Sequence, residues 1–391
     1  MLAALIGVAV LSFVLAAHPF GTYPLSLALG RRFHRRAPYP PARRSRTTTP
    51  RLALCFCAYR EAGVIEQKVA NLREIRRRIP DIQIFGFVDG SSDGTDAILE
   101  RHRDLINLTI SSERRGKTFG MNTLVAQTDA EILIFTDANV MIDPDGLDRM
   151  LDYFADPEIG CVAGHLIYIN SEETATSQNG ALYWRLEEAT KRLESETGST
   201  VGADGSLFAI RRELHSPVPD GGFDDLYVSM DILCQGYRVV SAPDVRCFER
   251  TATEPMDEFR RKIRIACEGF NVTRLMWPRL AKLPAFTLYK YLSHRVLRWF
   301  SIYLLGLSGL AWLGVLLMLL GWASVLALCA GGLVVATIGW RLRIGPVRRV
   351  VDILVAMTGV GIGVARSIRG DRFVMWAPAT SVRETGPSTG I

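Results

Sequence analysis

Strand-like and helix-like patterns of apolar residues alternate between residue 52 and about residue 276. Residues 52–57, 82–88 and 131–136 are nearly continuous apolar runs, which is typical of buried parallel strands. Helical spacing between the first two runs is kept by Ile65, Val69, Leu72, Ile75 and Ile79. Another helix is expected over 118–127. This alternation predicts an α/β fold with a mostly parallel sheet, whose ligands gather at the carboxyl ends of the strands.

The N-terminal segment is apolar and long enough to cross a ~30 Å hydrocarbon core. Residues 2–17 carry no charge, and after a break at His18, Pro19 and Gly21 the apolar character continues to Leu29. A secretory signal peptide is the alternative, but it would have its basic end first. Here the basic run RRFHRR follows, at 31–36. The positive-inside rule therefore favours a membrane anchor over 1–30, with residue 31 onward in the cytoplasm.

Two further apolar runs, 301–320 and 322–340, are separated only by Gly321 and predict a transmembrane hairpin that returns to the cytoplasm. The segment 350–365 is shorter and Gly-rich, and a third span, a re-entrant segment and an interfacial helix all remain open for it. The expected organisation is an anchor (1–30), a basic and Pro-rich linker (31–51), an α/β domain (52–276), interfacial helices (277–300), the hairpin (301–340), a basic loop with the third apolar segment (341–376) and a tail (377–391).

Composition narrows the class of protein. A hydrophobic content of 48% and a charged content of 22% exclude a mainly disordered chain. With 7 cysteines in 391 residues, the chain is too poor in cysteine to be a small disulfide scaffold. These cysteines form no CxxC pair, which excludes a sulfur-rich zinc site. The net charge of +6 comes largely from basic runs beside apolar segments, so it predicts contact with a lipid bilayer and no nucleic-acid partner.

Polar side chains follow the three predicted strands. Cys57-Ala58-Tyr59-Arg60-Glu61 follows the first strand, and Asp89-Gly90-Ser91-Ser92-Asp93-Gly94-Thr95 follows the second. Arg114-Arg115-Gly116-Lys117 precedes a helix, which is a natural anion site because free N–H groups and a lysine both favour phosphate. Thr136-Asp137-Ala138-Asn139 ends the third strand, where two oxygen-bearing side chains could hold a hard divalent cation. Taken singly, the turns that follow the second and third strands are also explained by turn and helix capping.

Taken together, this series resembles the inverting family 2 glycosyltransferases, which have the GT-A fold. The family's P-x-Y-N-E motif corresponds to 57–61, and its DDGSxDGT turn begins here with Val88 in place of the first Asp. Its Gly-Lys pair corresponds to Gly116-Lys117, and its metal-binding DxD to Asp137-Ala138-Asn139.

The resemblance continues downstream of the third strand. Residues 205–212 are similar to the loop that borders the acceptor, and Asp224-Asp225 to the pair that contains the catalytic base. Arg261-Lys262-Ile263-Arg264-Ile265 stands in the place of QxxRW and lacks both its Gln and its Trp. That Trp lies beneath the acceptor sugar in processive synthases, so its loss favours short products.

The resemblance implies roles for individual residues. Donor contacts are expected from Tyr59, Glu61, Asp89, Lys117, Asp137, Arg261 and Arg264. Mg²⁺ or Mn²⁺ is expected on Asp137 and Asn139, and acceptor contacts are expected from Asp204, Gly205 and Ser206. Asp225 is expected to be the base; Asp224 is the alternative, and two adjacent carboxylates raise the pKa of one of them.

The expected protein is a membrane-bound inverting glycosyltransferase, similar in layout to hyaluronan, cellulose and poly-N-acetylglucosamine synthases. It would move a sugar from a nucleotide-sugar, expected to be a UDP-sugar, to a glycan or lipid-linked acceptor of the cell envelope. Single addition to a glycolipid or polyprenyl-linked acceptor is one alternative, and a catalytically silent nucleotide-binding subunit is another. The donor sugar, the linkage and the oligomeric state stay open.

Overall fold

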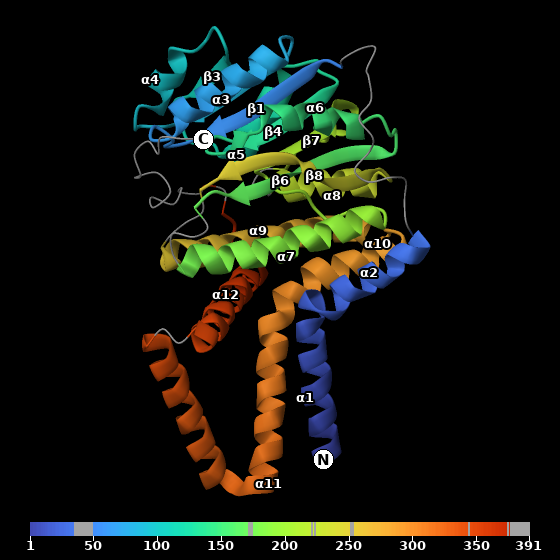
Figure 1. Cartoon of the computed structure of the whole chain (residues 1–391), viewed down its shortest axis with the longest axis vertical. Helices are drawn as coiled ribbons and strands as arrows, with labels where there is room; N and C mark the ends of the chain where they lie inside the picture. The colour runs from blue at the N-terminus through green and yellow to red at the C-terminus, as the bar shows by residue number, and fades with distance from the viewer. Residues whose placement is uncertain are drawn as a thin grey trace.

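An eight-stranded sheet forms the upper part of the molecule in Figure 1 and stands on a layer of long helices. The structure is a computed structural model, and it describes residues 1–34, 50–170, 175–219, 222, 224–250, 254–342, 345–373 and 375. Most of the linker predicted over 31–51 and the whole tail predicted over 377–391 lie outside the described residues.

The sheet is mostly parallel, as the sequence predicts. Its order is β3-β2-β1-β4-β7-β6-β8-β5. Only β7 and the short β5 run antiparallel to their neighbours. The strands are β1 (Leu52–Ala58), β2 (Gln83–Asp89), β3 (Asn107–Ser111), β4 (Ile132–Asp137), β5 (Met141–Ile142), β6 (Ile159–Tyr168), β7 (Leu207–Arg211) and β8 (Arg238–Glu249). The parallel strands β1, β2 and β4 therefore bring their carboxyl ends to one edge.

Two apolar cores lie on the two faces of the sheet, because successive strand side chains point to opposite sides. In β1, Leu54 and Phe56 belong to one core, while Ala53 and Cys55 belong to the other. The helices of this domain are α3 (Ile65–Arg78), α4 (Thr95–Glu100), α5 (Lys117–Ala126), α6 (Pro144–Tyr153), α7 (Ala175–Glu196), α8 (Asp224–Cys234) and α9 (Pro255–Leu280). Figure 1 places α7 and α9 between the sheet and the apolar helices.

Three segments are long and apolar enough to cross a membrane: Leu2–Phe20, Ala285–Arg341 and Val347–Ile368. The second contains α10 (Ala285–Tyr291), the π-helical turn η3 (Leu292–Val296) and α11 (Leu297–Arg341). Gly321 interrupts α11 with φ 75° and ψ 166°, so the two predicted apolar runs form a hairpin (Figure 1). The Ser308 hydroxyl donates to the Ala9 carbonyl at 2.8 Å, which ties the hairpin to α1 (Leu2–Ala17).

The range predicted as one anchor, 1–30, is two helices at an angle. The chain turns at η1 (His18–Phe20) and Gly21, and α2 (Thr22–His34) then lies along α7 (Figure 1). Arg31 pairs with Glu196 at 2.8 Å, and the Tyr23 hydroxyl donates to Glu194. Polar partners on α7 explain why α2 leaves the direction of the span, so only Leu2–Phe20 remains as a candidate N-terminal span.

The third apolar segment forms one continuous helix, α12 (Gly345–Ile368), which packs beneath α9 (Figure 1). Gly359 and Gly363 lie four residues apart against Phe259 and the Ile263 backbone. Small residues at this spacing let helices approach closely in membranes. The helix is long and apolar enough to cross a membrane, but its C-terminal end is bonded to α9, where the Ser367 hydroxyl donates to Asn271 Oδ1 at 2.7 Å. An unbroken helix therefore fits both a third span and an interfacial helix, two of the three alternatives for 350–365.

Candidate active site

Lys117 joins three elements at the carboxyl edge of the sheet. Its Nζ atom lies 2.8 Å from Asp137 Oδ1 at the end of β4 and 3.1 Å from Asp224 Oδ2 at the start of α8. Burial alone would lower the pKa of Lys117, but the carboxylates of Asp137, Asp224 and Asp225 outweigh burial and raise it well above its usual value. Lys117 is therefore a permanent cation between the predicted metal ligand and the predicted catalytic pair.

The turn after β2 holds Lys117 in place. Asp89 accepts hydrogen bonds from the backbone N–H groups of Arg115 (2.6 Å) and Gly116 (3.0 Å). Gly90 has φ +61°, and a Cβ there would lie 2.9 Å from the Arg114 backbone nitrogen. Only glycine tolerates both that φ and that close approach. Asp89 thus organises the cationic loop; its predicted contact with the donor stays a prediction.

The loop after β1 has a strained backbone beside an aromatic ring. Arg60 has φ 54° and is the only described residue other than glycine with a positive φ. The Arg114 guanidinium lies 3.6 Å from the centre of the Tyr59 ring, a cation–π contact. Glu61 is buried, and its backbone N–H donates to Thr95 Oγ1 at 2.9 Å. These residues lie at the carboxyl edge of the sheet, after β1. Their contacts with the donor stay predictions.

The two carboxylates of the pair have different surroundings. Burial raises the pKa of Asp225 to about 8, the charges of Asp224 and Asp204 raise it as well, and Lys117 only partly offsets them. Asp224 instead contacts Lys117 directly. The predicted raised pKa in this pair is thus confirmed and belongs to Asp225. A carboxyl group that titrates near the working pH is suited to general-base catalysis.

The loop predicted to border the acceptor rests on this pair. A Cβ at Gly205 would lie 3.0 Å from Asp225 Oδ2 and 3.3 Å from Lys117 Nζ, so any larger residue would press on these two side chains. The Ser206 carbonyl accepts from Thr136 Oγ1 at 2.8 Å, next to Asp137. The structure therefore brings Asp204, Gly205 and Ser206 to the edge that carries Asp137 and Asp225.

Helix α9 brings one of its two predicted arginines to the same place. Arg264 Nη1 lies 3.4 Å from Glu268 Oε2. Burial raises the pKa of Glu268 to about 7, and Asp224 and Lys117 both act on it, which places this pair beside the site. Arg261 pairs with Glu258 at 2.9 Å and lies near Tyr168 and Glu249. Of the two arginines, Arg264 is therefore the one that lies beside Lys117 and Asp224.

The chemistry of the donor atoms fits a hard divalent ion that is shared with a diphosphate. Asp137 offers a carboxylate at the end of β4, and Asn139 donates its amide nitrogen to Glu249 at 3.0 Å, so a metal would use its amide oxygen. No group of three or more His, Cys, Asp or Glu residues is placed to hold a metal among the residues that the structure describes. The remaining ligands would therefore come from phosphate oxygens and water.

Comparison with known proteins agrees with this arrangement. Residues 54–218, from β1 to beyond the acceptor loop, match the family described as "Glycosyl transferase family 2". The chain carries a family 2 glycosyltransferase domain.

Relatives of the domain include the poly-beta-1,6-N-acetyl-D-glucosamine synthases of Staphylococcus aureus strain MSSA476 and of Staphylococcus epidermidis. The first is 23% identical over 264 residues, 65% of this chain and 63% of the synthase. The second is 22% identical over 273 residues, 66% of this chain and 64% of the synthase. The aligned region thus covers less than two thirds of either relative.

A solved mannosyltransferase, PcManGT from Pyrobaculum calidifontis, has a similar fold. Its TM-score is 0.72 with 24% sequence identity, and the match covers 94% of this chain and 100% of that chain. The likeness establishes a GT-A fold for the glycosyltransferase domain and extends over nearly the whole chain.

Two buried lysines of the family 2 domain were missed by the sequence prediction. Lys68 is fully buried and donates to Val140 O (2.6 Å) and Thr136 Oγ1 (3.3 Å), which fixes both ends of the Asp137 loop. Burial lowers the pKa of Lys68 to about 7. Its position, three residues after Ile65 on the apolar face, was the available signal. Lys191 on α7 offered no such signal, because its partner Asp204 is fixed only by the tertiary fold.

Proposed function

We propose that the chain is a membrane-bound inverting glycosyltransferase that moves a sugar from a nucleotide-sugar to a glycan or lipid-linked acceptor in cell-envelope polysaccharide synthesis. The observation that carries this proposal is the meeting of Asp225, Asp224, Lys117 and Asp137 at one edge of a family 2 domain. The name of the staphylococcal relatives, poly-beta-1,6-N-acetyl-D-glucosamine synthase, supports a role in polysaccharide synthesis. A UDP-sugar is the proposed donor.

Asp225 is the proposed base. Its carboxylate takes the proton from the acceptor hydroxyl as the oxygen attacks the anomeric carbon. The new bond joins that oxygen to the anomeric carbon, the bond to the diphosphate oxygen breaks, and the nucleoside diphosphate leaves with its electron pair. One base and one displacement from the opposite face invert the anomeric configuration.

Lys117 and Arg264 are the proposed cations for the diphosphate. Lys117 is a point charge, and Arg264 offers a planar fork that suits phosphate oxygens. Asp137, with Asn139, would hold Mg²⁺ or Mn²⁺, and when bound such an ion acts as a Lewis acid on the leaving group. PcManGT was described in complex with GDP-Man and Mn²⁺, which supports a divalent ion and leaves the nucleotide base to be tested.

Product length is proposed to be short. Ile265 follows Arg264 and is 37% exposed, and it offers no ring face on which an acceptor sugar could stack. Long polymer formed from the start of the reaction, with acceptor left unused, would contradict single or few additions.

The test uses the full chain purified in detergent. It is incubated with a panel of UDP- and GDP-sugars, with Mn²⁺, Mg²⁺ or excess EDTA, and released nucleoside diphosphate is measured. One donor should give metal-dependent release, and Asp137→Ala should abolish it. Tight donor binding with no release for any sugar would favour the silent subunit and overturn the proposal. Full activity in excess EDTA would show that the reaction needs no divalent metal ion.

A further inference from the structure

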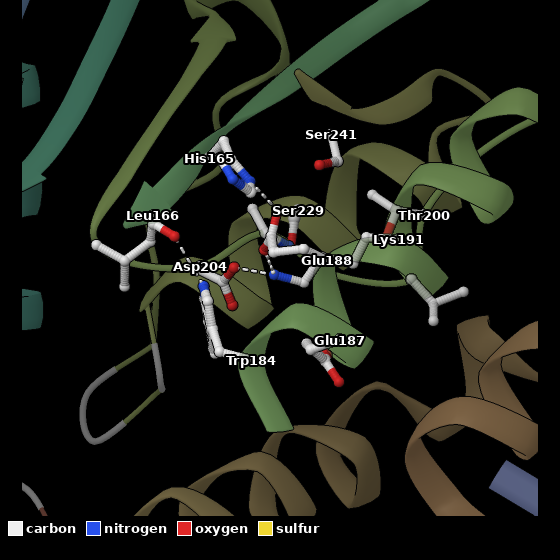
Figure 2. Close-up of polar contacts among 12 residues, drawn as sticks. His165, Leu166, Trp184, Glu187, Glu188, Lys191, Thr200, Asp204, Ser229 and Ser241 are labelled. Atoms are coloured by element: carbon white, nitrogen blue, oxygen red, sulfur yellow. Dashed lines mark hydrogen bonds and ion pairs between the residues drawn. The ribbon is translucent and has the colours of Figure 1, made fainter. Parts of the chain in front are cut away.

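Helix α7 carries buried charges on two faces. Glu187 and Glu194 point towards the apolar helices, where His294 bonds Glu194 at 2.7 Å and Glu187 at 3.0 Å. Glu188 and Lys191 lie on the side of α7 that faces His165 and Asp204, as Figure 2 shows. The Lys191 side chain is 1% exposed, although an isolated ammonium of this kind is costly to bury.

Lys191 is held by a set of partners that lie far apart in the sequence. Its Nζ atom pairs with Asp204 and lies 2.9 Å from Glu188 Oε1. Glu188 in turn bonds His165 Nδ1 at 2.7 Å (Figure 2). The Trp184 ring lies 4.6 Å from the ammonium, and its N–H donates to the Leu166 carbonyl at 3.0 Å.

Asp204 connects this cluster to the catalytic pair. It precedes Gly205, where a Cβ would lie 3.0 Å from Asp225 Oδ2. The backbone N–H of Ala203 donates to Ser229 Oγ at 3.0 Å, and that hydroxyl donates to the Asp225 carbonyl at 2.7 Å. The acceptor loop is therefore fixed to Lys191 on one side and to helix α8 on the other.

We propose that Lys191 is a positioning residue for the transfer reaction: through its ion pair with Asp204 it holds the acceptor loop against Asp225 and neutralises a negative charge beside the base. The inference rests on the proposed role of Asp225. Lys191 reaches the reacting atoms only through Asp204, so it is not a catalytic residue in its own right.

The charges around Asp225 predict the direction in which its pKa should change when Lys191 is replaced. Asp224 faces it from α8, Lys117 from α5 and Asp204 from the acceptor loop, while Glu268 and Arg264 on α9 act near Asp224. Without the Lys191 ammonium, Asp204 would be an uncompensated carboxylate, and the proton on Asp225 would be held more tightly. Because a nearby like charge raises a carboxyl pKa, Lys191→Met should move the acidic limb of the pH–rate profile upward by ~0.5–1 pH unit.

The experiment compares four variants of the full chain in detergent. Lys191→Met removes the charge and keeps the length of the side chain, and Lys191→Arg keeps the charge. Lys191→Met combined with Asp204→Asn removes both partners. Lys290→Met is the matched control, because Lys290 is also a buried lysine but donates to three backbone carbonyls, of Glu194, Thr197 and Ser199. Each variant is checked for folding by thermal unfolding and assayed for kcat/KM against pH.

A second readout does not need activity. The pH dependence of Asp225 labelling by a water-soluble carbodiimide, which reacts with protonated carboxyls, is followed by mass spectrometry of the peptide containing Asp225. We expect Lys191→Met to move the acidic limb of the kcat/KM profile and the midpoint of Asp225 labelling to higher pH by the same amount. Lys191→Arg and the double variant should return both to the wild-type value or below.

Three outcomes decide between the possibilities. If Lys191→Met lowers the rate equally at every pH and the double variant brings no recovery, Lys191 is only structural and the inference is wrong. A shift of the same size in Lys290→Met would also overturn it. If the wild-type chain transfers no sugar, the proposed function fails, while the labelling midpoint still reports whether Lys191 sets the proton affinity of Asp225.

Discussion

Asp224 and Asp225 are neighbours in the chain and yet face different tasks. Asp224 binds Lys117 at 3.1 Å, whereas Asp225 lies under the acceptor loop with its pKa raised to about 8 by burial first and by Asp224 second. From the sequence, Asp225 is the expected base and Asp224 is the alternative. The difference in surroundings favours Asp225, because Asp224 is already paired with Lys117, whereas Asp225 is a buried carboxyl group whose pKa lies near the working pH.

Asp225→Asn keeps the shape of the side chain but cannot take the proton. We expect turnover to fall by ~10²-fold or more, with donor affinity nearly unchanged, as for an interaction made only in the transition state. Transfer and calorimetric donor binding in Mn²⁺ are measured on the same preparation. Asp224→Asn is the matched control; near-normal transfer by Asp225→Asn with an inactive Asp224→Asn would mean that the roles are exchanged.

The pH dependence follows from the same residue. A base works in its deprotonated form, and the pKa of Asp225 is raised to about 8, so kcat/KM should climb with pH and level off above that value. Below it, the rate should fall about tenfold per pH unit, because the fraction of carboxylate falls tenfold. A profile that is flat from pH 6 to pH 9 would contradict the assignment of Asp225.

Individual contacts explain where sequence prediction stops. The ends of β1, β2 and β4 could be predicted, because apolar runs there stop at Tyr59, Asp89 and Asp137. That Lys191 pairs with Asp204, and His294 with Glu187, could not be predicted. The charged pattern of α7 indicates a solvent face, and only tertiary packing brings Lys191 and Glu187 to their partners.

At the scale of elements, helices α9 and α12 depend on close backbone contact. A Cβ at Gly363 would lie 2.4 Å from the Ile263 carbonyl oxygen, a backbone atom that cannot move cheaply. We expect Gly363→Ala to destabilise the protein by about 1–3 kcal/mol, the usual cost of overpacking. Thermal unfolding in detergent measures this.

Gly306→Ala on α11 is the control for Gly363→Ala, because a Cβ at Gly306 meets no atom within 4 Å. Gly306→Ala should leave the midpoint of thermal unfolding unchanged or raise it slightly, since alanine has a higher helix propensity than glycine. Equal effects of the two substitutions would show that glycine flexibility, and not close packing, sets the outcome.

The sequence indicated the apolar length of α12 but not its partner, since glycine spacing alone does not say which helix approaches.

For the whole molecule, the basic runs 31–36 and 341–349 predict a catalytic domain on the cytoplasmic side. In a Cys329→Ser background, cysteines placed at Pro40 and Gly345 should be shielded from an impermeant thiol reagent added to intact cells. Trp322, beside the hairpin turn and 74% exposed, is the control position, and Trp322→Cys should be labelled from outside. External labelling at Pro40 or Gly345 would overturn the cytoplasmic site.

The buried carboxylates of α7 have a consequence for any soluble fragment of this protein. Glu194 has its pKa lowered to about 2, because His294, Tyr23 and Lys290 outweigh its burial, and Glu187 is paired with His294 and Arg298. A fragment that ended after α9 and began at β1 would lose all four partners and keep both carboxylates. The same cut removes the helices that carry these partners, so the surface of α7 that they cover would meet water and Glu187 and Glu194 would lie on it as unpaired carboxylates. A soluble fragment should therefore present a new acidic surface on α7, and a hybrid with the membrane helices of another protein would need cationic partners for these two residues.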